Sequence, residues 1–324
     1  MRKKGLVERI VMRQPSEVSF SAEKLPANRR QLFSYMIKNK FLKIYKNHLL
    51  IGLFFLPLVV WGIMTMDYSN MIFSLDPREG ITLLPEYWVT VYVTAIPLWM
   101  LAFVGLSGGL NVLRKLAWSD PVIMKHDFIH GIKSSASQMS FVGFVFGVVF
   151  ALIRYAMDWL GFYYRVFDSS PTVIFGIFVC VFVLLVAIGM TVYMTCMSSL
   201  YNVTIRELFV GAFKLYFVDF LPATGVFVLS LLPILLLFAM DYAITRLVGY
   251  LLVLLTVGIL IIPMFLMCHH SFDRIINKKD YPDYYGKGLS YGTYSAVVEQ
   301  MVEKAPNYPS KIDEINDFER VTDE

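Results

Sequence analysis

The sequence has little charge for its length. Only 17% of its 324 residues are charged, while 57% are hydrophobic. Soluble domains carry about 25% charged residues, so this composition excludes an ordinary soluble enzyme. Three cysteines are too few for the disulfide framework of a small secreted scaffold. A chain of this composition is expected to fold partly within a lipid bilayer.

The sequence also lacks the motifs of common catalytic sites. It contains no Walker A loop, no HExxH, no GxSxG and no dinucleotide-binding fingerprint. The adjacent His269 and His270 point about 100° apart on a helix, and no second cluster supplies further metal ligands. We therefore expect no catalytic residue, no cofactor and no bound metal, and classify the protein as not an enzyme.

Ionisable residues are almost absent from the apolar runs. Arg154 is the one charge well inside a predicted span, and it lies four residues before Asp158. An i,i+4 ion pair near the outer interface explains this arginine. Proton- and sodium-coupled carriers usually show a buried acid or a broken-helix site, so the sequence disfavours such a carrier.

The apolar residues are gathered into six runs of membrane-spanning length. A helix needs roughly 20 residues to cross about 30 Å of hydrocarbon, and continuous apolar runs favour helices over a barrel. The predicted spans are Leu49–Met66, Tyr87–Ser107, Met139–Leu160, Thr172–Ser198, Phe220–Met240 and Leu247–Cys268. The sequence thus predicts an all-α, polytopic membrane bundle of six transmembrane helices. The polar stretch before the first run predicts that there is no cleavable signal peptide.

The distribution of Lys and Arg predicts the orientation. Of the 29 basic residues, 25 lie in the two ends and in the connections 108–138 and 199–219. The alternate connections hold one each, namely Arg78, Arg165 and Arg246. Because basic segments are retained on the cytoplasmic side, we expect a multi-pass protein of the plasma membrane with both termini in the cytoplasm.

Charge also divides the chain into segments. Residues 1–28 form a basic N-terminal segment, residues 29–275 the membrane domain, and residues 276–324 a tyrosine-rich and then acidic cytoplasmic tail. Within the second segment, Arg29–His48 is predicted to be an amphipathic helix on the anionic inner leaflet. Its basic side chains are Lys38, Lys40, Lys43 and Lys46. No nucleic-acid partner is expected, because no binding fold accompanies these charges.

Two predicted cytoplasmic connections repeat one pattern at an offset of 80 residues. Each has an acid, two bulky apolar residues, one variable position and a glycine. The residues singled out are Asp127, Phe128 and Gly131 in the first copy and Glu207, Gly211 and Ala212 in the second. With Arg29–His48, the pattern suggests three repeats of an interfacial helix plus a hairpin, or a coincidence between two interfacial helices. The residues either cap and pack helices within the chain or dock a cytoplasmic partner.

Several small features bear on packing and transport. Proline bends a helix, and Pro57, Pro97, Pro233 and Pro263 each lie inside a predicted span. Gly143 and Gly147 form a GxxxG pair, which is typical of a tight helix crossing. A carrier would need a polar cavity, and the candidate lining residues are Thr90, Thr94, Thr191 and Tyr193.

The segment Gly105–Leu116, with the following Asp120-Pro121-Val122 and Asp127–Lys133, resembles the YesL-like family of bacterial membrane proteins. Shared features are small residues at the end of a span, a Leu-Arg-Lys turn, an acid-Pro-Val step and an Asp-Phe helix. The family is a domain of unknown function without known catalytic residues. Its members are often encoded among carbohydrate-uptake genes of Gram-positive bacteria, so the resemblance implies a role near that process.

A second similarity concerns ABC importer permeases. These place a short cytoplasmic helix with an acid, a Gly-Ala pair and a later Leu-Pro where the ATPase docks. Glu207, Gly211-Ala212 and Leu221-Pro222 have the same order with shorter spacings.

The leading hypothesis is a non-enzymatic accessory protein of carbohydrate uptake that binds importer subunits. One alternative is a transporter or permease-like subunit for a small polar solute. Another is a membrane sensor whose loop 67–86 detects a signal outside the cell and whose acidic tail transmits it inside.

Overall fold

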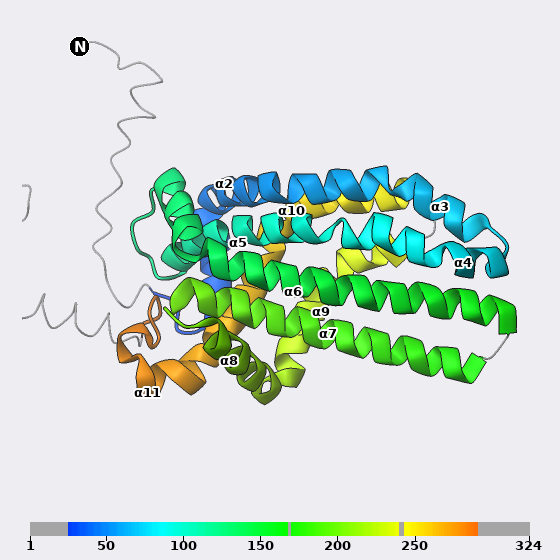
Figure 1. The fold of residues 1–324 in the computed structure, drawn as a ribbon. Helices are drawn as coiled ribbons and strands as arrows, with labels where there is room; N and C mark the ends of the chain where they lie inside the picture. The colour runs from blue at the N-terminus through cyan, green and yellow to red at the C-terminus, as the bar shows by residue number, and fades with distance from the viewer. Residues whose placement is uncertain (1–24, 168–169, 240–242, 291–324) are drawn as a thin grey trace, which may run out of the picture.

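The computed structural model describes residues 25–167, 170–239 and 243–290. In these residues every regular element is a helix, which confirms the predicted all-α class. The longest helices are α2 (Arg29–Met64), α5 (Ile96–Ala117), α6 (Met124–Phe167), α7 (Ser170–Leu200) and α10 (Ala243–Phe272). Figure 1 shows α2, α5, α6 and α7 running side by side along the bundle.

Five described segments have the length and apolar composition of membrane-spanning helices, and a bent pair is a sixth. The five are Arg29–Met64, Pro77–Ala117, Met124–Phe167, Pro171–Leu200 and Leu247–Asp280. The bent pair consists of α8 (Ile205–Val218) and the start of α9 (Phe220–Ala239), with an angle of 95° between them. Four predicted spans lie within α6, α7, α9 and α10, apart from Met240, which is outside the described residues. Leu49–Met66 instead runs from α2 into α3 (Met66–Ser74), and Tyr87–Ser107 runs from the end of α4 (Pro77–Trp88) into α5. The chain has the helices of an integral membrane protein.

Residues 67–86, predicted as an outer loop, are mostly helical. They lie in α3 (Met66–Ser74) and α4 (Pro77–Trp88). The Asp76 side chain accepts a hydrogen bond from the backbone two residues on, and Pro77 occupies the first turn of α4, where no intrahelical donor is needed. These helices are too short to give a membrane-length apolar run, so hydropathy alone does not predict them.

The four predicted kink positions differ in their surroundings. Pro57, Pro233 and Pro263 lie inside α2, α9 and α10, and each helix continues through its proline. Pro97 instead lies in the first turn of α5, after the π-helix η2 (Val89–Val93). A proline removes one backbone donor and its ring meets the carbonyl four residues earlier, which explains why the regular hydrogen-bond ladder is interrupted ahead of Pro97.

Glycines bring α5 and α6 close together. A Cβ atom on Gly143 would lie 2.9 Å from the Met100 Cα, and one on Gly147 would lie 3.3 Å from the Ile96 Cα. These are the glycines of the predicted GxxxG pair, so the structure identifies α5 as the helix they cross.

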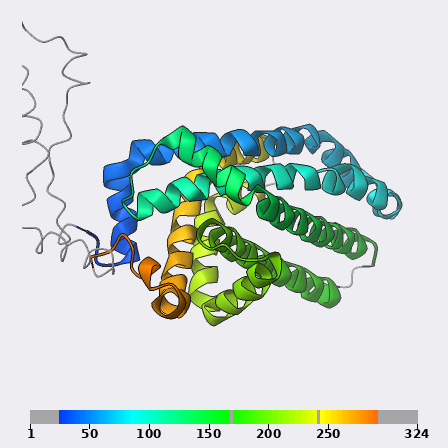
Figure 2. The same cartoon turned by 60° about the vertical axis from the view of Figure 1, so that its left-hand side comes forward.

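The predicted interfacial helix Arg29–His48 is not a separate element, because α2 continues through it without a break. In Figure 2 the first turns of α2, in dark blue, run at an angle to the rest of the helix. Leu32 and Met36 are fully buried against the bundle, whereas Phe41 is 50% and Leu42 65% exposed. This segment therefore packs on the protein along one side and presents an apolar surface on the other.

Only the third predicted repeat has a separate short helix. The second repeat, which contains Asp127, is continuous with its span, since α6 runs unbroken from Met124 to Phe167. The third is divided at Asp219, whose amide donates to the Leu215 carbonyl at the end of α8 and whose carbonyl accepts from Ala223 at the start of α9. The three units are therefore not built alike.

Candidate functional site

Segments distant in the sequence meet at one end of the bundle, which we call the basic end. It comprises the starts of α2, α6 and α8, the ends of α5, α7 and α10, and residues 281–290, which we call the strap. The described chain begins and ends here, since the Ser290 amide donates to the Pro26 carbonyl at 3.1 Å. All residues of the two repeated patterns and the four predicted surface lysines lie at or near this end.

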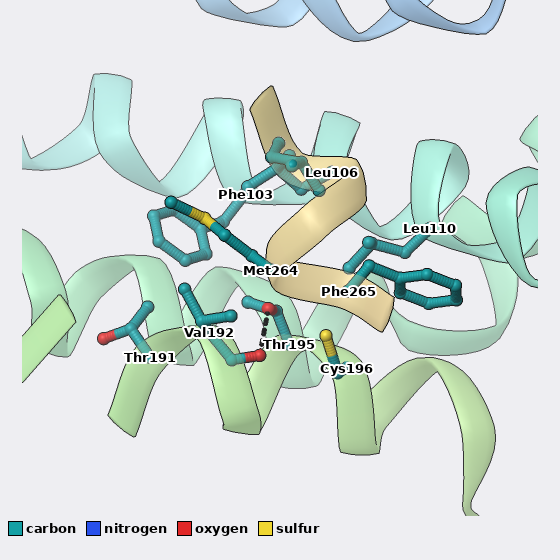
Figure 3. Close-up of a pocket in the computed structure, with 10 residues that line it drawn as sticks. Phe103, Leu106, Leu110, Thr191, Val192, Thr195, Cys196, Met264 and Phe265 are labelled. Atoms are coloured by element: carbon teal, nitrogen blue, oxygen red, sulfur yellow. Dashed lines mark hydrogen bonds between the residues drawn. The ribbon is translucent and has the colours of Figure 1, made fainter. Parts of the chain in front are cut away.

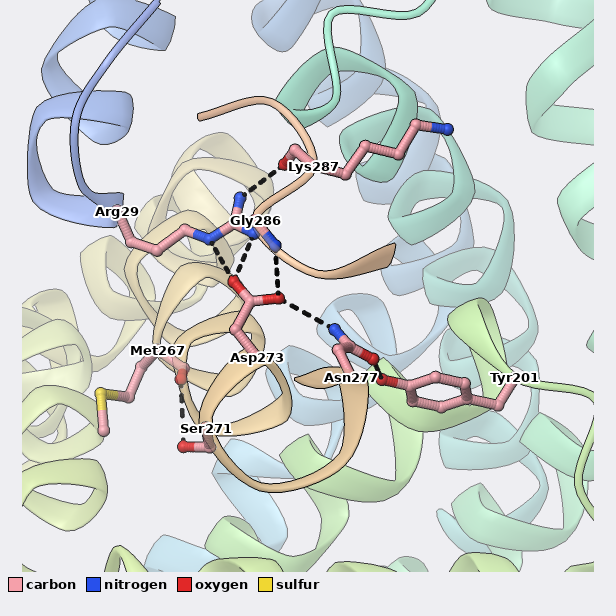
Figure 4. A network of polar contacts seen from close by, with 8 residues as sticks. All are labelled: Arg29, Tyr201, Met267, Ser271, Asp273, Asn277, Gly286 and Lys287. Atoms are coloured by element: carbon pink, nitrogen blue, oxygen red, sulfur yellow. Dashed lines mark hydrogen bonds and ion pairs between the residues drawn. The ribbon is translucent and has the colours of Figure 1, made fainter. Parts of the chain in front are cut away.

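A buried cluster around Asp273 joins three of these segments (Figure 4). The Arg29 Nη2 lies 2.6 Å from the Asp273 Oδ2, and both side chains are 6% exposed. The Asn277 Nδ2 donates to the other carboxylate oxygen at 2.9 Å, and the Tyr201 hydroxyl donates to the Asn277 Oδ1 at 2.6 Å. A buried ion pair is tolerated when hydrogen bonds satisfy its remaining atoms, and this one is satisfied on both carboxylate oxygens.

The strap is fitted closely to the same cluster. The Gly286 amide donates to the Asp273 Oδ1 at 3.3 Å, and Leu289 is only 1% exposed. Gly288 has a φ of +84°, and a Cβ there would lie 2.1 Å from the Ala117 carbonyl oxygen. Only glycine fits this position. Residues 276–290, which the sequence assigned to the tail, are therefore part of the packed structure.

Asp127, predicted as a docking residue, is buried, with 4% of its side chain exposed. Its Oδ1 accepts from the Lys115 Nζ at 2.7 Å, and its Oδ2 accepts from the Ile123 amide at 2.8 Å. Its backbone carbonyl accepts from Asn111 at 2.7 Å. Asp127 thus caps the start of α6 and ties it to α5.

Phe128 and Gly131 complete the same contact. Phe128 is 4% exposed, and a Cβ on Gly108 would lie 2.8 Å from its carbonyl oxygen. A Cβ on Gly131 would lie 2.6 Å from the Asn111 Cβ and 2.9 Å from the Ser107 carbonyl oxygen. Asp127, Phe128 and Gly131 are thus occupied by contacts within the chain, and we do not propose them as docking residues.

The second copy of the pattern lies in a different environment. Thr204 and Glu207 form a capping box at the start of α8, in which the Glu207 Oε2 accepts from the Thr204 amide at 2.8 Å. The Glu207 side chain is exposed. Hydrogen bonds from the Thr204 backbone and hydroxyl lower the pKa of Glu207 below its ordinary value.

The remaining residues of this copy face inward. Ala212 is fully buried, and a Cβ on Gly211 would lie 2.7 Å from the Met197 Cε, the mobile end of a flexible side chain. The opposite side of α8 is exposed, and we call it the α8 outer face. It is formed by Glu207, Val210, Phe213, Lys214 and Phe217.

Basic side chains at this end bind the free carbonyls of helix ends. The Lys40 Nζ donates to the Leu116 carbonyl at 2.7 Å near the end of α5, and the Arg114 Nη1 donates to the Ser199 carbonyl at 2.7 Å near the end of α7. Cations are stabilised at helix C-termini. Lys40 is therefore bound to the end of α5, whereas Lys38, Lys43 and Lys46 are exposed. Contact of these three with a leaflet stays a prediction.

The opposite end of the bundle holds a second buried polar group. The predicted i,i+4 pair is present, with the Arg154 Nη2 3.2 Å from the Asp158 Oδ1. The Tyr92 hydroxyl donates to the other Asp158 oxygen at 3.2 Å and accepts from Arg154 at 3.2 Å. Tyr87 and Phe162, both nearly fully buried, belong to a hydrophobic cluster beside it. The pair thus belongs to a structural cluster with α3 and α4.

A small cavity of about 70 Å³ lies between α5, α7 and α10 (Figure 3). Its walls are largely apolar, with Phe103, Met264 and Phe265 among them. The hydroxyls of Thr191 and Thr195 donate to carbonyls of their own helix at 2.6 and 2.8 Å. The cavity therefore presents few free polar atoms to a solute.

The residues predicted to line a carrier cavity are dispersed. Thr90 and Thr94 are exposed near the far end, and the Thr94 hydroxyl donates to the Thr90 carbonyl. Tyr193 is fully buried on α7 and shares a 2.8 Å hydrogen bond with Ser271. Of the four, Thr191 alone lines the described cavity.

The cysteines and histidines form no evident ligand set within the described ranges. There, no group of three or more His, Cys, Asp or Glu side chains is arranged to hold a metal ion. Cys180, Cys196 and Cys268 are free thiols, and His269 is fully buried on α10. The absence of a metal, a cofactor and an enzymatic activity stays a prediction.

Sequence reasoning missed the Asp273 cluster and the strap. Both depend on contacts between residues more than 200 positions apart, as in the Arg29–Asp273 pair. A usable signal was present in Gly286-Lys287-Gly288-Leu289, because two glycines around one lysine beside a tyrosine-rich stretch favour a tight, packed turn.

The chain has no significant match to a protein-family model, to a curated protein or to a solved structure. The resemblance to the YesL-like family, which is best over residues 105–138, therefore remains a prediction.

Proposed function

We propose that this protein is a non-enzymatic membrane component that binds other proteins, as an accessory part of a carbohydrate-uptake system. The observation that carries partner binding is the α8 outer face, which lies on a short helix set at 95° to the segment after it. The link to carbohydrate uptake comes only from the resemblance to the YesL-like family.

The α8 outer face has the composition of a protein interface. Phe213 is 51%, Val210 47% and Phe217 44% exposed, and the exposed charges of Glu207 and Lys214 lie beside them. Exposed apolar patches with a polar rim mark interaction sites, and aromatic residues are enriched at the centre of interfaces. The inward side of the helix is packed on the bundle, so this surface is held in place rather than free to fold on binding.

The similarity to ABC importer permeases gives the class of partner, an ATPase subunit that docks on a short helix between spans. Gly211 and Ala212 face the bundle, so contacts with such a subunit would come from Glu207 and the exposed aromatic residues. The predicted orientation places α8 in the cytoplasm, where an ATPase would reach it, and it places Lys38, Lys43 and Lys46 beside the anionic inner leaflet of the plasma membrane.

The cavity between α5, α7 and α10 favours an accessory role over transport. It is small and largely apolar, and the predicted carrier residues do not converge on it. A solute pathway needs polar groups that replace water, and the threonine hydroxyls at this cavity already bind backbone carbonyls.

Copurification tests this function. The tagged protein is extracted gently from its own membranes, and mass spectrometry identifies what accompanies it. We expect importer subunits in a near-fixed ratio. A double swap on α8, Glu207→Lys with Lys214→Glu, keeps the net charge and should reduce their recovery at least about tenfold, the loss expected when an interface charge pattern is inverted. The matched control, Lys133→Glu with Glu86→Lys, alters exposed charges elsewhere and should not. Equal recovery from both variants contradicts docking at α8.

One observation favours the second candidate, a transporter. Broken helices often border the solute site of a carrier, and the bent α8–α9 pair is such a break. Purified protein in liposomes that moves a labelled oligosaccharide without other subunits would establish this candidate and exclude the accessory role.

A further inference from the structure

The two ends of the described chain are fixed side by side. The Ser290 amide donates to the Pro26 carbonyl, the Arg29 Nη1 donates to the Lys287 carbonyl at 3.1 Å, and Gly286 binds Asp273. Ser290 therefore lies beside Pro26, which precedes the first residue of α2 by three positions in the sequence.

The sequence that follows Ser290 is strongly acidic. Residues 291–324 hold eight carboxylates and three basic side chains, a net charge of −5. Residues 312–319 read Ile-Asp-Glu-Ile-Asn-Asp-Phe-Glu, so apolar residues recur every three positions with carboxylates between them. A segment of this kind is suited to a surface that is both basic and apolar.

Such a surface is exposed on α2. Lys38, Lys43 and Lys46 are exposed, and none forms an ion pair with a carboxylate in the part of the chain that the structure describes. Phe41 and Leu42, 50% and 65% exposed, lie among them. The neighbouring Lys40 donates to the Leu116 carbonyl and is therefore not part of this exposed surface.

The distances allow contact. Lys38 and Lys46 lie roughly 14 and 26 Å along α2 from Arg29 at 1.5 Å per residue. Glu299 is the first carboxylate after Ser290, and nine residues reach up to about 30 Å when extended. Tethering also makes the encounter intramolecular, which raises the local concentration of the acidic segment well above that of a free peptide.

We propose that the acidic segment 299–324 binds the basic face of α2 formed by Lys38, Lys43 and Lys46, in competition with anionic lipid. The segment acts as an internal ligand that carries the same charge as a phospholipid headgroup. Its release would free α2 to engage the leaflet, an electrostatic switch within one chain. This inference does not depend on the α8 outer face or on its partner.

Zero-length crosslinking tests it directly. The full-length protein is placed in nanodiscs of zwitterionic lipid and treated with a carbodiimide, which joins a carboxylate to an amine in contact with it. Mass spectrometry should find segment 299–324 joined to Lys38, Lys43 or Lys46. Because 1 M salt shortens the Debye length from about 10 to about 3 Å, the yield should fall about fivefold or more. Discs with anionic lipid should lower it similarly.

Variants test which carboxylates bind the lysines of α2. Neutralising four carboxylates, with Asp313→Asn, Glu314→Gln, Asp317→Asn and Glu319→Gln, should also reduce the crosslinks formed by the four that remain, because the segment then binds more weakly. The remaining carboxylates are Glu299, Glu303, Asp323 and Glu324. The control Asp280→Asn with Asp283→Asn neutralises two exposed carboxylates ahead of Ser290 and should leave the yield unchanged. Crosslinks confined to lysines of residues 1–24, or to Lys278 and Lys279, would overturn the proposal, as would their absence or their persistence at equal yield in anionic discs.

Discussion

The two copies of the acid–glycine pattern have the same order of residue types but lie in different environments. Asp127 is buried, is bonded through both carboxylate oxygens and ties α6 to α5. Glu207 is exposed, and within the described part of the chain its side chain bonds to Thr204 of its own capping box. The pattern thus marks the first turn of a helix in both places, and the neighbouring helix decides whether its acid is structural or available. The difference can be tested position by position.

The glycines should show the largest contrast. Gly131→Ala places a Cβ against the Ser107 carbonyl and the Gly108 Cα, which are backbone atoms that cannot move aside. We expect a loss of about 2–3 kcal/mol in the free energy of unfolding, as for an overpacked core. The measurement is chemical denaturation of the detergent-solubilised protein, followed by tryptophan fluorescence.

Gly211→Ala is the matched control. Its Cβ would meet only the end of the Met197 side chain, and alanine favours the helix by about 1 kcal/mol over glycine. Stability should be unchanged or slightly raised. Equal losses at both glycines would remove the distinction between the two copies.

The acid of the first copy should have an intermediate effect. Asp127→Ala removes the acceptor of the Ile123 amide at the start of α6 and the partner of Lys115. Loss of a hydrogen-bonded helix cap costs about 0.5–2 kcal/mol, and we expect a decrease in that range by the same denaturation assay. Asp127→Asn keeps one acceptor and should recover part of the loss. Full stability of the alanine variant would show that this carboxylate does not hold α6 to α5.

The acid of the second copy should have the smallest effect. Glu207→Ala opens an exposed capping box, so the first amides of α8 should exchange with deuterium faster while the denaturation midpoint stays the same. Since hydrogen bonds lower the pKa of Glu207, its capping contribution is complete above the ordinary glutamate pKa and is lost as the pH falls through the lowered value. A large change in the midpoint would show that α8 has a global role in stability.

Local patterns predicted the local features well. Apolar runs predicted the spans, spacing predicted the Arg154–Asp158 pair, and the GxxxG pair predicted a tight crossing. Its partner, α5, could not be predicted, because a spacing on one helix says nothing of the helix opposite. The burial of the Asp127 side chain against α5 could not be predicted either, because it also depends on which helix lies opposite.

Local sequence patterns could not predict the Asp273 cluster or the helices α3 and α4. Asp273 is buried because Arg29, the strap and Asn277 converge on it from different parts of the chain. The short α3 and α4 are stabilised by packing on Phe162 at the end of α6, and an isolated helix of that length is marginal in water.

Both buried polar clusters contain a π-helical turn. Tyr92 lies in η2 (Val89–Val93), and Asp273 and Asn277 lie in η3 (Asp273–Asn277). Such a turn holds one residue more than an α-helical turn. Deleting one residue from either would restore regular α-helix and rotate the flanking parts by about 100° relative to each other. These positions should therefore resist insertion and deletion.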